Sequence, residues 1–141
     1  MSASKEHDLI VALIARHIRQ EGFEIVAIET SLSWLFGDTF HLPLAIVHHR
    51  PDVLGVRAEP PYISLGEAKT RGDLKSPRTA QQLIDFSKVE INSTGTRCQV
   101  TVGVPQDCEP QLRRLMGSLK IPENRINVLL VPRSLLSKQM K

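Results

Sequence analysis

Cysteine is scarce in this chain, and the scarcity excludes two kinds of small scaffold. Only Cys98 and Cys108 occur among the 141 residues, and their spacing fits neither a disulfide framework nor a zinc site with four ligands. No apolar run approaches the roughly 18 residues that a membrane-spanning helix needs, and the residues before the first apolar segment are polar. We therefore expect a soluble protein of the cytoplasm.

Aromatic residues and net charge are also sparse. Phe, Trp and Tyr make up 4% of the chain, and Trp34, Phe36 and Phe40 all fall within residues 31–41. Burial in the core or in a dimer interface is the favoured interpretation of this segment, with stacking on nucleic-acid bases as the alternative. The formal net charge of +3 is compatible with a polyanionic partner but does not identify one.

The length fits a single domain spanning 1–141 with a substantial core. Hydrophobic periodicity and capping residues predict helices and strands in alternation. Helices are expected over 5–20, 77–92 and 110–120, and strands over 24–30, 42–48 with 52–56, 62–70, 99–104 and 126–131. Pro60 and Pro61 mark the turn of an antiparallel hairpin. This order predicts an α/β fold in which helices flank a mixed central sheet.

Two carboxylates and a lysine occupy the ends of two apolar stretches. Asp52 lies in the sequence Arg-Pro-Asp-Val-Leu-Gly-Val, and Glu67 and Lys69 lie in Tyr-Ile-Ser-Leu-Gly-Glu-Ala-Lys-Thr. Strand alternation places Glu67 and Lys69 on one face. Taken singly, these residues read as a turn aspartate and an exposed ion pair. Taken together, they favour a Mg²⁺ site, because hard oxygen ligands suit that ion.

The expected roles follow from that chemistry. Asp52 and Glu67 would bind the metal, with the backbone carbonyl of Ala68 as a further ligand and water in the remaining positions. Lys69 would orient the attacking water and stabilise the transition state of phosphodiester hydrolysis. A second acid-x-Lys triplet, Asp73-Leu74-Lys75, falls in a predicted loop between Gly72 and Pro77, and we interpret it as unrelated to the site.

The pattern resembles the PD-(D/E)xK, or restriction-endonuclease-like, nuclease superfamily. Pro51-Asp52 and Glu67-Ala68-Lys69 match its central motifs. Glu6 matches the acid of the opening helix, where the chain is similar to archaeal Holliday junction resolvases, and Gln82 matches the glutamine motif of RecB-type members. Glu21 or Gln81 would replace these two if the helix phase differs. The resemblance covers about residues 5–131 and implies an α-β-β-β-α-β core.

The resemblance also implies a function. It predicts a Mg²⁺- or Mn²⁺-dependent DNA endonuclease that acts as a homodimer, with Glu6 and Gln82 supporting the site. Three basic residues after Lys69 are candidates for binding DNA phosphates, namely Arg71, Lys75 and Arg78. Two other interpretations stay open: a nuclease-like module that binds DNA or protein without cutting it, and a zinc protein built from the cysteines with His41, His48 and His49.

Overall fold

The computed structural model describes residues 4–36, 46, 48–91 and 94–140. Within these residues no helix is long and apolar enough to cross a membrane. In chain order the helices and strands are α1 (Lys5–Gln20), β1 (Glu24–Ile28), β2 (Val53–Val56), β3 (Ile63–Ala68), α2 (Pro77–Ser87), β4 (Gln99–Pro105), α3 (Glu109–Ser118), β5 (Asn127–Val131) and α4 (Arg133–Met140). Single 3₁₀ turns lie at Ser33–Phe36 (η1), Asp73–Lys75 (η2) and Gln106–Cys108 (η3).

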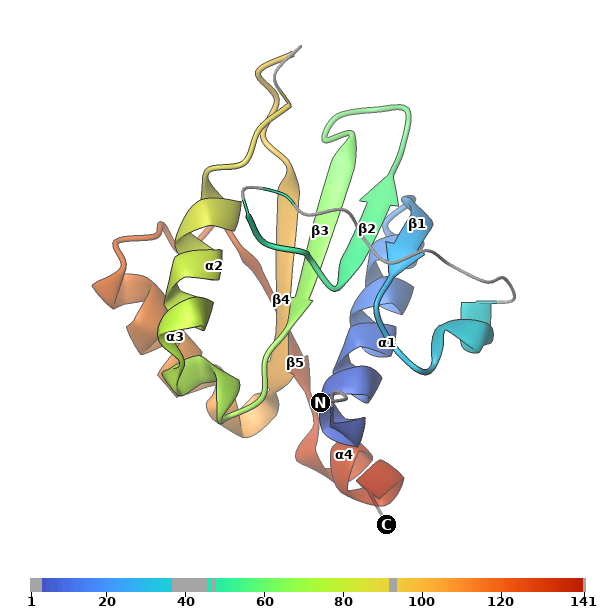
Figure 1. Cartoon of the computed structure of the whole chain (residues 1–141), viewed down its shortest axis with the longest axis vertical. Coiled ribbons are helices and arrows are strands. Elements are labelled where there is room, and N and C mark those ends of the chain that lie inside the picture. The colour runs from blue at the N-terminus through green and yellow to red at the C-terminus, as the bar shows by residue number, and fades with distance from the viewer. Residues whose placement is uncertain (1–3, 37–45, 47, 92–93, 141) are drawn as a thin grey trace.

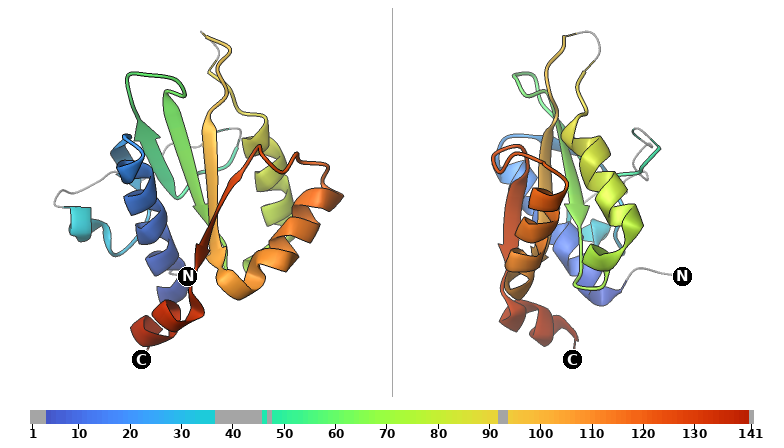
Figure 2. Two further views of the ribbon diagram at one scale, coloured as in Figure 1. Left: turned by 180° about the vertical axis from the view of Figure 1, so that it is seen from behind. Right: turned by 90° about the vertical axis from the view of Figure 1, so that its left-hand side faces the viewer.

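The five strands form one mixed sheet in the order β1-β2-β3-β4-β5 (Figure 1). β2 pairs antiparallel with both β1 and β3, whereas β3, β4 and β5 are parallel to one another. Helices cover both faces, with α1 and α4 on one side and α2 and α3 on the other (Figures 1 and 2). The predicted α/β fold with a mixed sheet and flanking helices is confirmed at this level.

Helix α1 packs unusually close to the sheet because glycines lie beneath it. A Cβ atom on Gly66 would lie 2.5 Å from Ile14 Cγ2, and one on Gly103 would lie 2.7 Å from Ile14 Cδ1. The Ser4 side chain caps the helix by accepting a hydrogen bond of 3.0 Å from the backbone N–H of His7. The cap and the glycines together fix where the first turn of α1 meets the sheet.

The opposite face of the sheet packs against α2 and α3. Leu65, Val100 and Val102 of the strands form one cluster with Leu83 and Phe86 of α2, and Leu112 and Met116 of α3 complete it. Burying such side chains contributes roughly 1.5–3 kcal/mol each. The cluster fixes α2 against β3, and this contact sets the distance between residues at the start of α2 and residues at the end of β3.

Several predicted boundaries are wrong. Helix α2 ends at Ser87 rather than at 92, because the chain from Val89 turns extended and pairs with the segment before β4: Cys98 N–H donates to Val89 O, and Glu90 pairs with Arg97. β-branched residues at 89 and 91 favour that extended conformation over a helix. Helix α4 was not predicted, since Leu135 and Leu136 are too short an apolar signal.

The second strand is shorter than predicted. Of the segment 42–48, only Ile46 and His48 lie within the described residues, and Ile46 pairs with His49 in an isolated bridge instead of joining β2. Phe40 and His41 lie outside the described residues. In η1, Phe36 packs against the α1 side of the core, whereas the Trp34 side chain is 68% exposed.

Candidate active site

The hairpin of β2 and β3 brings Asp52 and Glu67 together. Val53 pairs with Gly66 in this hairpin, so Asp52 lies beside Glu67 where the two strands end. The backbone N–H of Asp52 donates to Glu67 Oε1 at 3.0 Å. The Asp52 carboxylate in turn accepts a 2.8 Å hydrogen bond from the backbone N–H of Ala68. Each carboxylate is therefore oriented by the backbone of the other strand.

Lys69 and Gln82 complete this group from β3 and α2. Lys69 Nζ lies 3.0 Å from Glu67 Oε2 and donates a hydrogen bond to Gln82 Oε1. Asp52, Glu67, Lys69 and Gln82 are only 7%, 3%, 7% and 4% exposed. Charged residues are rarely buried to this extent unless they are paired. Residues that are up to 30 positions apart in the sequence thus form one buried polar cluster.

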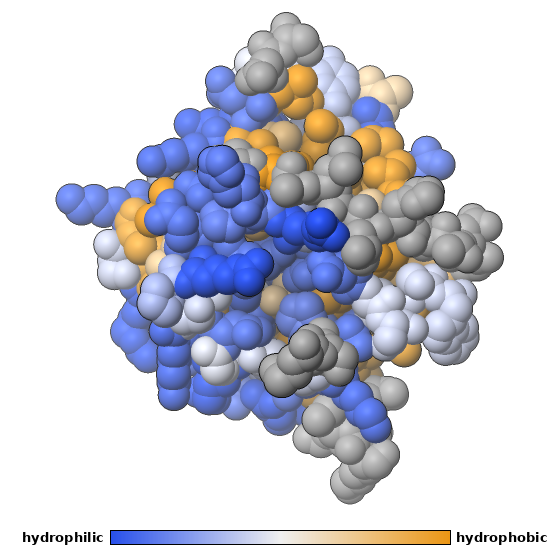
Figure 3. Space-filling model, in the orientation of Figure 1, coloured by the Kyte–Doolittle hydropathy of each residue, from blue (hydrophilic) through white to orange (hydrophobic). Residues whose placement is uncertain are grey.

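The cluster opens into a cavity of about 380 Å³ between the sheet and the start of α2. That volume lies in the range of roughly 300–1,000 Å³ that is usual for ligand sites. Hydrophilic side chains cover the middle of the face seen in Figure 3. The cavity is lined by His7, Glu29, Arg50, Asp52, Glu67, Lys69, Asp73, Ser76, Arg78, Thr79 and Gln82.

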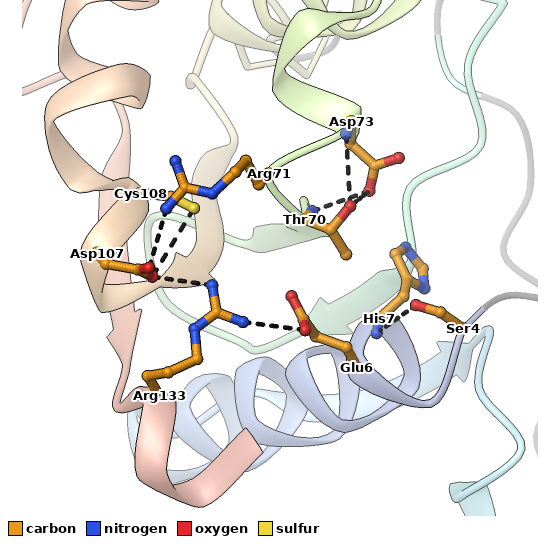
Figure 4. A network of polar contacts seen from close by, with 9 residues as sticks. All are labelled: Ser4, Glu6, His7, Thr70, Arg71, Asp73, Asp107, Cys108 and Arg133. Carbon is orange, nitrogen blue, oxygen red and sulfur yellow. Dashed lines mark hydrogen bonds and ion pairs between the residues drawn. The ribbon is translucent and has the colours of Figure 1, made fainter. Parts of the chain in front are cut away.

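His7 is a site residue that the sequence analysis missed. Its Nε2 lies 3.4 Å from Asp52 Oδ2, and its Nδ1 is buried without a hydrogen-bond partner. Figure 4 shows Glu6 pointing toward Arg133, while His7 lies nearer to Thr70 and Asp73. The helix phase gives the signal that would have identified it, because His7 precedes Val11, Ile14 and Ile18 at steps of four, seven and eleven residues on the most buried stripe of α1.

The electrostatics of the site oppose negative charge on Glu67. Burial raises the pKa of Glu67 to about 8, the Asp52 carboxylate adds to the increase, and Lys69 opposes it. Burial by itself would lower the pKa of His7, but its hydrogen bond to Asp52 and the charge of that carboxylate outweigh burial, so the pKa is raised. The shift of Glu67 therefore comes from burial beside a second carboxylate, whereas the shift of His7 comes from its contact with Asp52.

No family model, curated protein or solved structure matches this chain. The interpretation of the site therefore depends on its own chemistry and geometry.

The predicted supporting acid Glu6 and the two alternatives, Glu21 and Gln81, lie away from the cavity. Glu6 forms an ion pair with Arg133, whose Nη1 lies 3.1 Å from Glu6 Oε2, and Glu6 does not line the cavity. Glu21 lies at the other end of α1, where its side chain accepts a hydrogen bond from Gln99. Gln81 is exposed and donates to Asp85, so Gln82 is the glutamine of α2 that reaches the site.

Of the three predicted phosphate-binding residues, one lines the cavity and two do not. Arg78 lines the cavity. Arg71 does not, because its guanidinium pairs with Asp107 at 2.9 Å, and Asp107 also binds Arg133 (Figure 4). Lys75 is exposed outside the cavity.

The triplet Asp73-Leu74-Lys75 forms the 3₁₀ turn η2, in the connection between β3 and α2 where the sequence predicts a loop. Its aspartate nevertheless lines the cavity, with Oδ2 held by the N–H and hydroxyl of Thr70.

The donor set fits a hard divalent cation that keeps water ligands. Among the residues that the structure describes, no three His, Cys, Asp or Glu side chains form a group able to hold a metal ion alone. Mg²⁺ does not require one, because it commonly binds through one or two carboxylates, with water and substrate phosphate as the other ligands. Asp52 and Glu67 supply two such carboxylates. The pKa of Glu67 is raised by burial and by the charge of Asp52, and a cation beside the pair would favour the ionised form of both.

Proposed function

We propose that this chain is a Mg²⁺- or Mn²⁺-dependent DNA endonuclease with a restriction-endonuclease-like fold. The observation that carries the proposal is the convergence of Asp52, Glu67, Lys69 and Gln82, from three separate elements, on one cavity. A lysine and two carboxylates in one buried cluster is a combination that a purely structural site rarely needs, since burying unneutralised carboxylates destabilises a fold.

Asp52 and Glu67 would hold the metal, which when bound supplies a Lewis acid and lowers the pKa of a water molecule. The backbone carbonyl of Ala68 remains a further candidate ligand. His7 is placed to position Asp52 through its Nε2. Together these residues would hold a cation beside the ends of β2 and β3, within the cavity that a phosphate would enter.

Lys69 stabilises the negative charge of the transition state. Its ammonium is compact, is held between Glu67 and Gln82, and can donate to the attacking water or to a phosphoryl oxygen. Gln82 fixes the position of this ammonium by accepting one of its hydrogen bonds. Because the group is pre-positioned in a site from which water is largely excluded, its charge acts with little reorganisation during the reaction.

Two features support DNA as the substrate. The cavity carries the cationic side chains Arg50 and Arg78, which suit a phosphate backbone. The resemblance of the sequence motifs to DNA nucleases supplies the rest. A homodimer would allow two such cavities to act on two strands.

The decisive experiment measures cleavage of supercoiled, linear and branched DNA with Mg²⁺, Mn²⁺ or EDTA. Asp52→Asn and Lys69→Met are the test variants, and Lys88→Ala, which changes an exposed lysine at the end of α2, is the matched control. We expect both test variants to lose at least about 100-fold in rate, because Lys69→Met removes a preorganised donor that contributes about that much and Asp52→Asn removes a metal ligand. The control should cleave normally. Circular dichroism checks that each variant is folded.

Two results would overturn the proposal. Equal cleavage by the wild type and both test variants would assign the activity to another site or to a contaminant. DNA that is bound but not cut with either metal would favour the alternative of a non-catalytic nuclease-like module.

A further inference from the structure

The cavity contains a second group of polar side chains, which take no part in the hydrolysis step itself. Arg50, Arg78 and Thr79 all line it. Neither guanidinium makes a hydrogen bond or an ion pair with the described residues through its side chain, whereas Lys69 in the same cavity has two partners. Unpaired guanidinium groups beside a reactive centre are suited to binding an anion that the protein itself does not supply.

Thr79 is the most informative member of this group. It is only 2% exposed, and its hydroxyl makes no hydrogen bond with the part of the chain that the structure describes. Because Thr79 also lines the cavity, its hydroxyl is available to donate a hydrogen bond to an anionic ligand there.

The start of α2 adds a favourable electrostatic field. Thr79 lies in the first turn, after the N-cap Ser76 and Pro77. The backbone amides of Arg78 and Thr79 already donate to Ser76 Oγ and Ser76 O, so they are not free ligands. The aligned peptide dipoles still place partial positive charge at this end of the helix, where an anion is stabilised.

The position of Thr79 relates the group to the reaction. Thr79 precedes Gln82 by three residues, so both side chains lie on the same face of α2, about one helical turn apart. Gln82 in turn holds Lys69. A phosphate bound by Thr79 would therefore lie beside the one that Lys69 and the metal ligands address.

The charge of the cavity is compatible with a bound anion when a divalent cation is present. Four carboxylates and three cationic side chains line the cavity, and a divalent cation brings the formal charge to +1. Asp73 and Glu29 are the carboxylates outside the metal site, and Asp73 is held by Thr70.

We propose that Thr79, Arg78 and Arg50 form a phosphate subsite, which takes a phosphate of the nucleic-acid strand next to the one that is hydrolysed. This inference rests on the proposed function. The subsite would position the strand rather than perform chemistry. The phosphate is either an internal diester or a terminal monoester, and the two sources can be separated experimentally.

The test follows binding rather than cleavage. The ¹⁵N-labelled protein is titrated in Mg²⁺ with the dinucleotides TpT and pTpT, and amide signals of Arg78, Thr79 and Ala80 are followed by NMR before hydrolysis is detectable. We expect saturable shifts in the wild type. Thr79→Val and Arg78→Gln should each raise the Kd at least about tenfold, because each removes a hydrogen bond to a charged group. Thr79→Ser, which keeps the hydroxyl, and the exposed Arg114→Gln should leave it unchanged.

The outcomes are distinct. Tighter binding of pTpT than of TpT assigns a terminal phosphate, and equal binding assigns an internal diester. Unshifted α2 signals, or a Thr79→Val variant that binds like the wild type, would overturn the subsite. If the amide signals of α2 shift but the wild-type protein never cleaves DNA, the proposed function fails while the subsite stands. If DNA is cleaved without a response at α2, only the subsite fails.

Discussion

Adding Mg²⁺ to the metal-free protein should release protons at neutral pH, and Glu67 sets the amount. Its pKa is raised to about 8 by burial and by Asp52. A group with that pKa is about 90% protonated at pH 7 and about 10% protonated at pH 9. A carboxyl group must lose its proton to become a metal ligand. Glu67 should therefore contribute about 0.9 proton per bound Mg²⁺ at pH 7 and about 0.1 at pH 9.

The sign of the effect on stability follows from the same shift. Glu67 has an ordinary pKa of 4.5 and a folded-state pKa of about 8, so the folded protein binds more protons than the unfolded chain between these values. The contribution of Glu67 to the free energy of unfolding therefore falls as the pH rises from 4.5 to 8 and is constant above 8. Saturating Mg²⁺ should offset this loss. Apparent Mg²⁺ affinity should rise about tenfold per pH unit below pH 8 and level off above it.

A pH-stat titration measures the released protons directly. MgCl₂ is added to weakly buffered protein at pH 7 and pH 9, with NaCl at equal ionic strength as the blank. His7 also has a raised pKa, so the variant His7→Asn removes any proton that its imidazole contributes. If Mg²⁺ binds but releases no protons at pH 7, or equal amounts at both pH values, the reasoning about Glu67 is refuted.

Three further predictions concern what positions the site. Gly103→Ala should destabilise the protein by about 1–3 kcal/mol, because the new Cβ would collide with α1. Gly117→Ala is the control and should stabilise the protein by about 0.5–1 kcal/mol, because its Cβ would have no atom within 4 Å. Urea denaturation measures both, and a change of stability in the same direction for the two variants would contradict the packing argument. Ser4→Ala should cost about 1 kcal/mol and increase amide hydrogen exchange at His7, because it removes the helix cap; unchanged exchange would contradict it. Arg133→Ala should destabilise the protein by about 1 kcal/mol or less, since the Arg133 side chain is exposed and only its partner Glu6 is partly buried. A loss above about 3 kcal/mol in urea denaturation would contradict this.

The convergence of Asp52, Glu67 and Lys69 was predictable because it depends on local rules. Strand alternation places Glu67 and Lys69 on one face, and a short hairpin brings the residue before β2 next to the end of β3. Gly66 and Ala68 lie on the opposite face of β3, where small side chains leave room for a helix, and a Cβ on Gly66 would collide with Ile14 of α1.

Errors arose where one element had to be oriented against another. Glu6 and His7 are adjacent on α1, and their separation of about 100° around the helix axis decides which of them meets Asp52. The apolar residues Leu9 and Leu13 broadened the stripe and hid the phase that packing selects. Likewise, Arg71 and Arg78 look equivalent in sequence, but Asp107 binds Arg71 from another part of the chain.

The sequence by itself determined the order of helices and strands from α1 to β5, the mixed sheet, and Asp52, Glu67 and Lys69 at its end, because period, capping and turn chemistry act over a few residues. Only the tertiary structure decided the rest of the cavity. His7, Arg50 and Thr79 come from three separate segments. His7 and Thr79 face the cavity because of how α1 and α2 dock on the sheet, and Arg50 reaches it from the segment before β2. Docking depends on how side chains interlock across elements, and no spacing within a single segment specifies that.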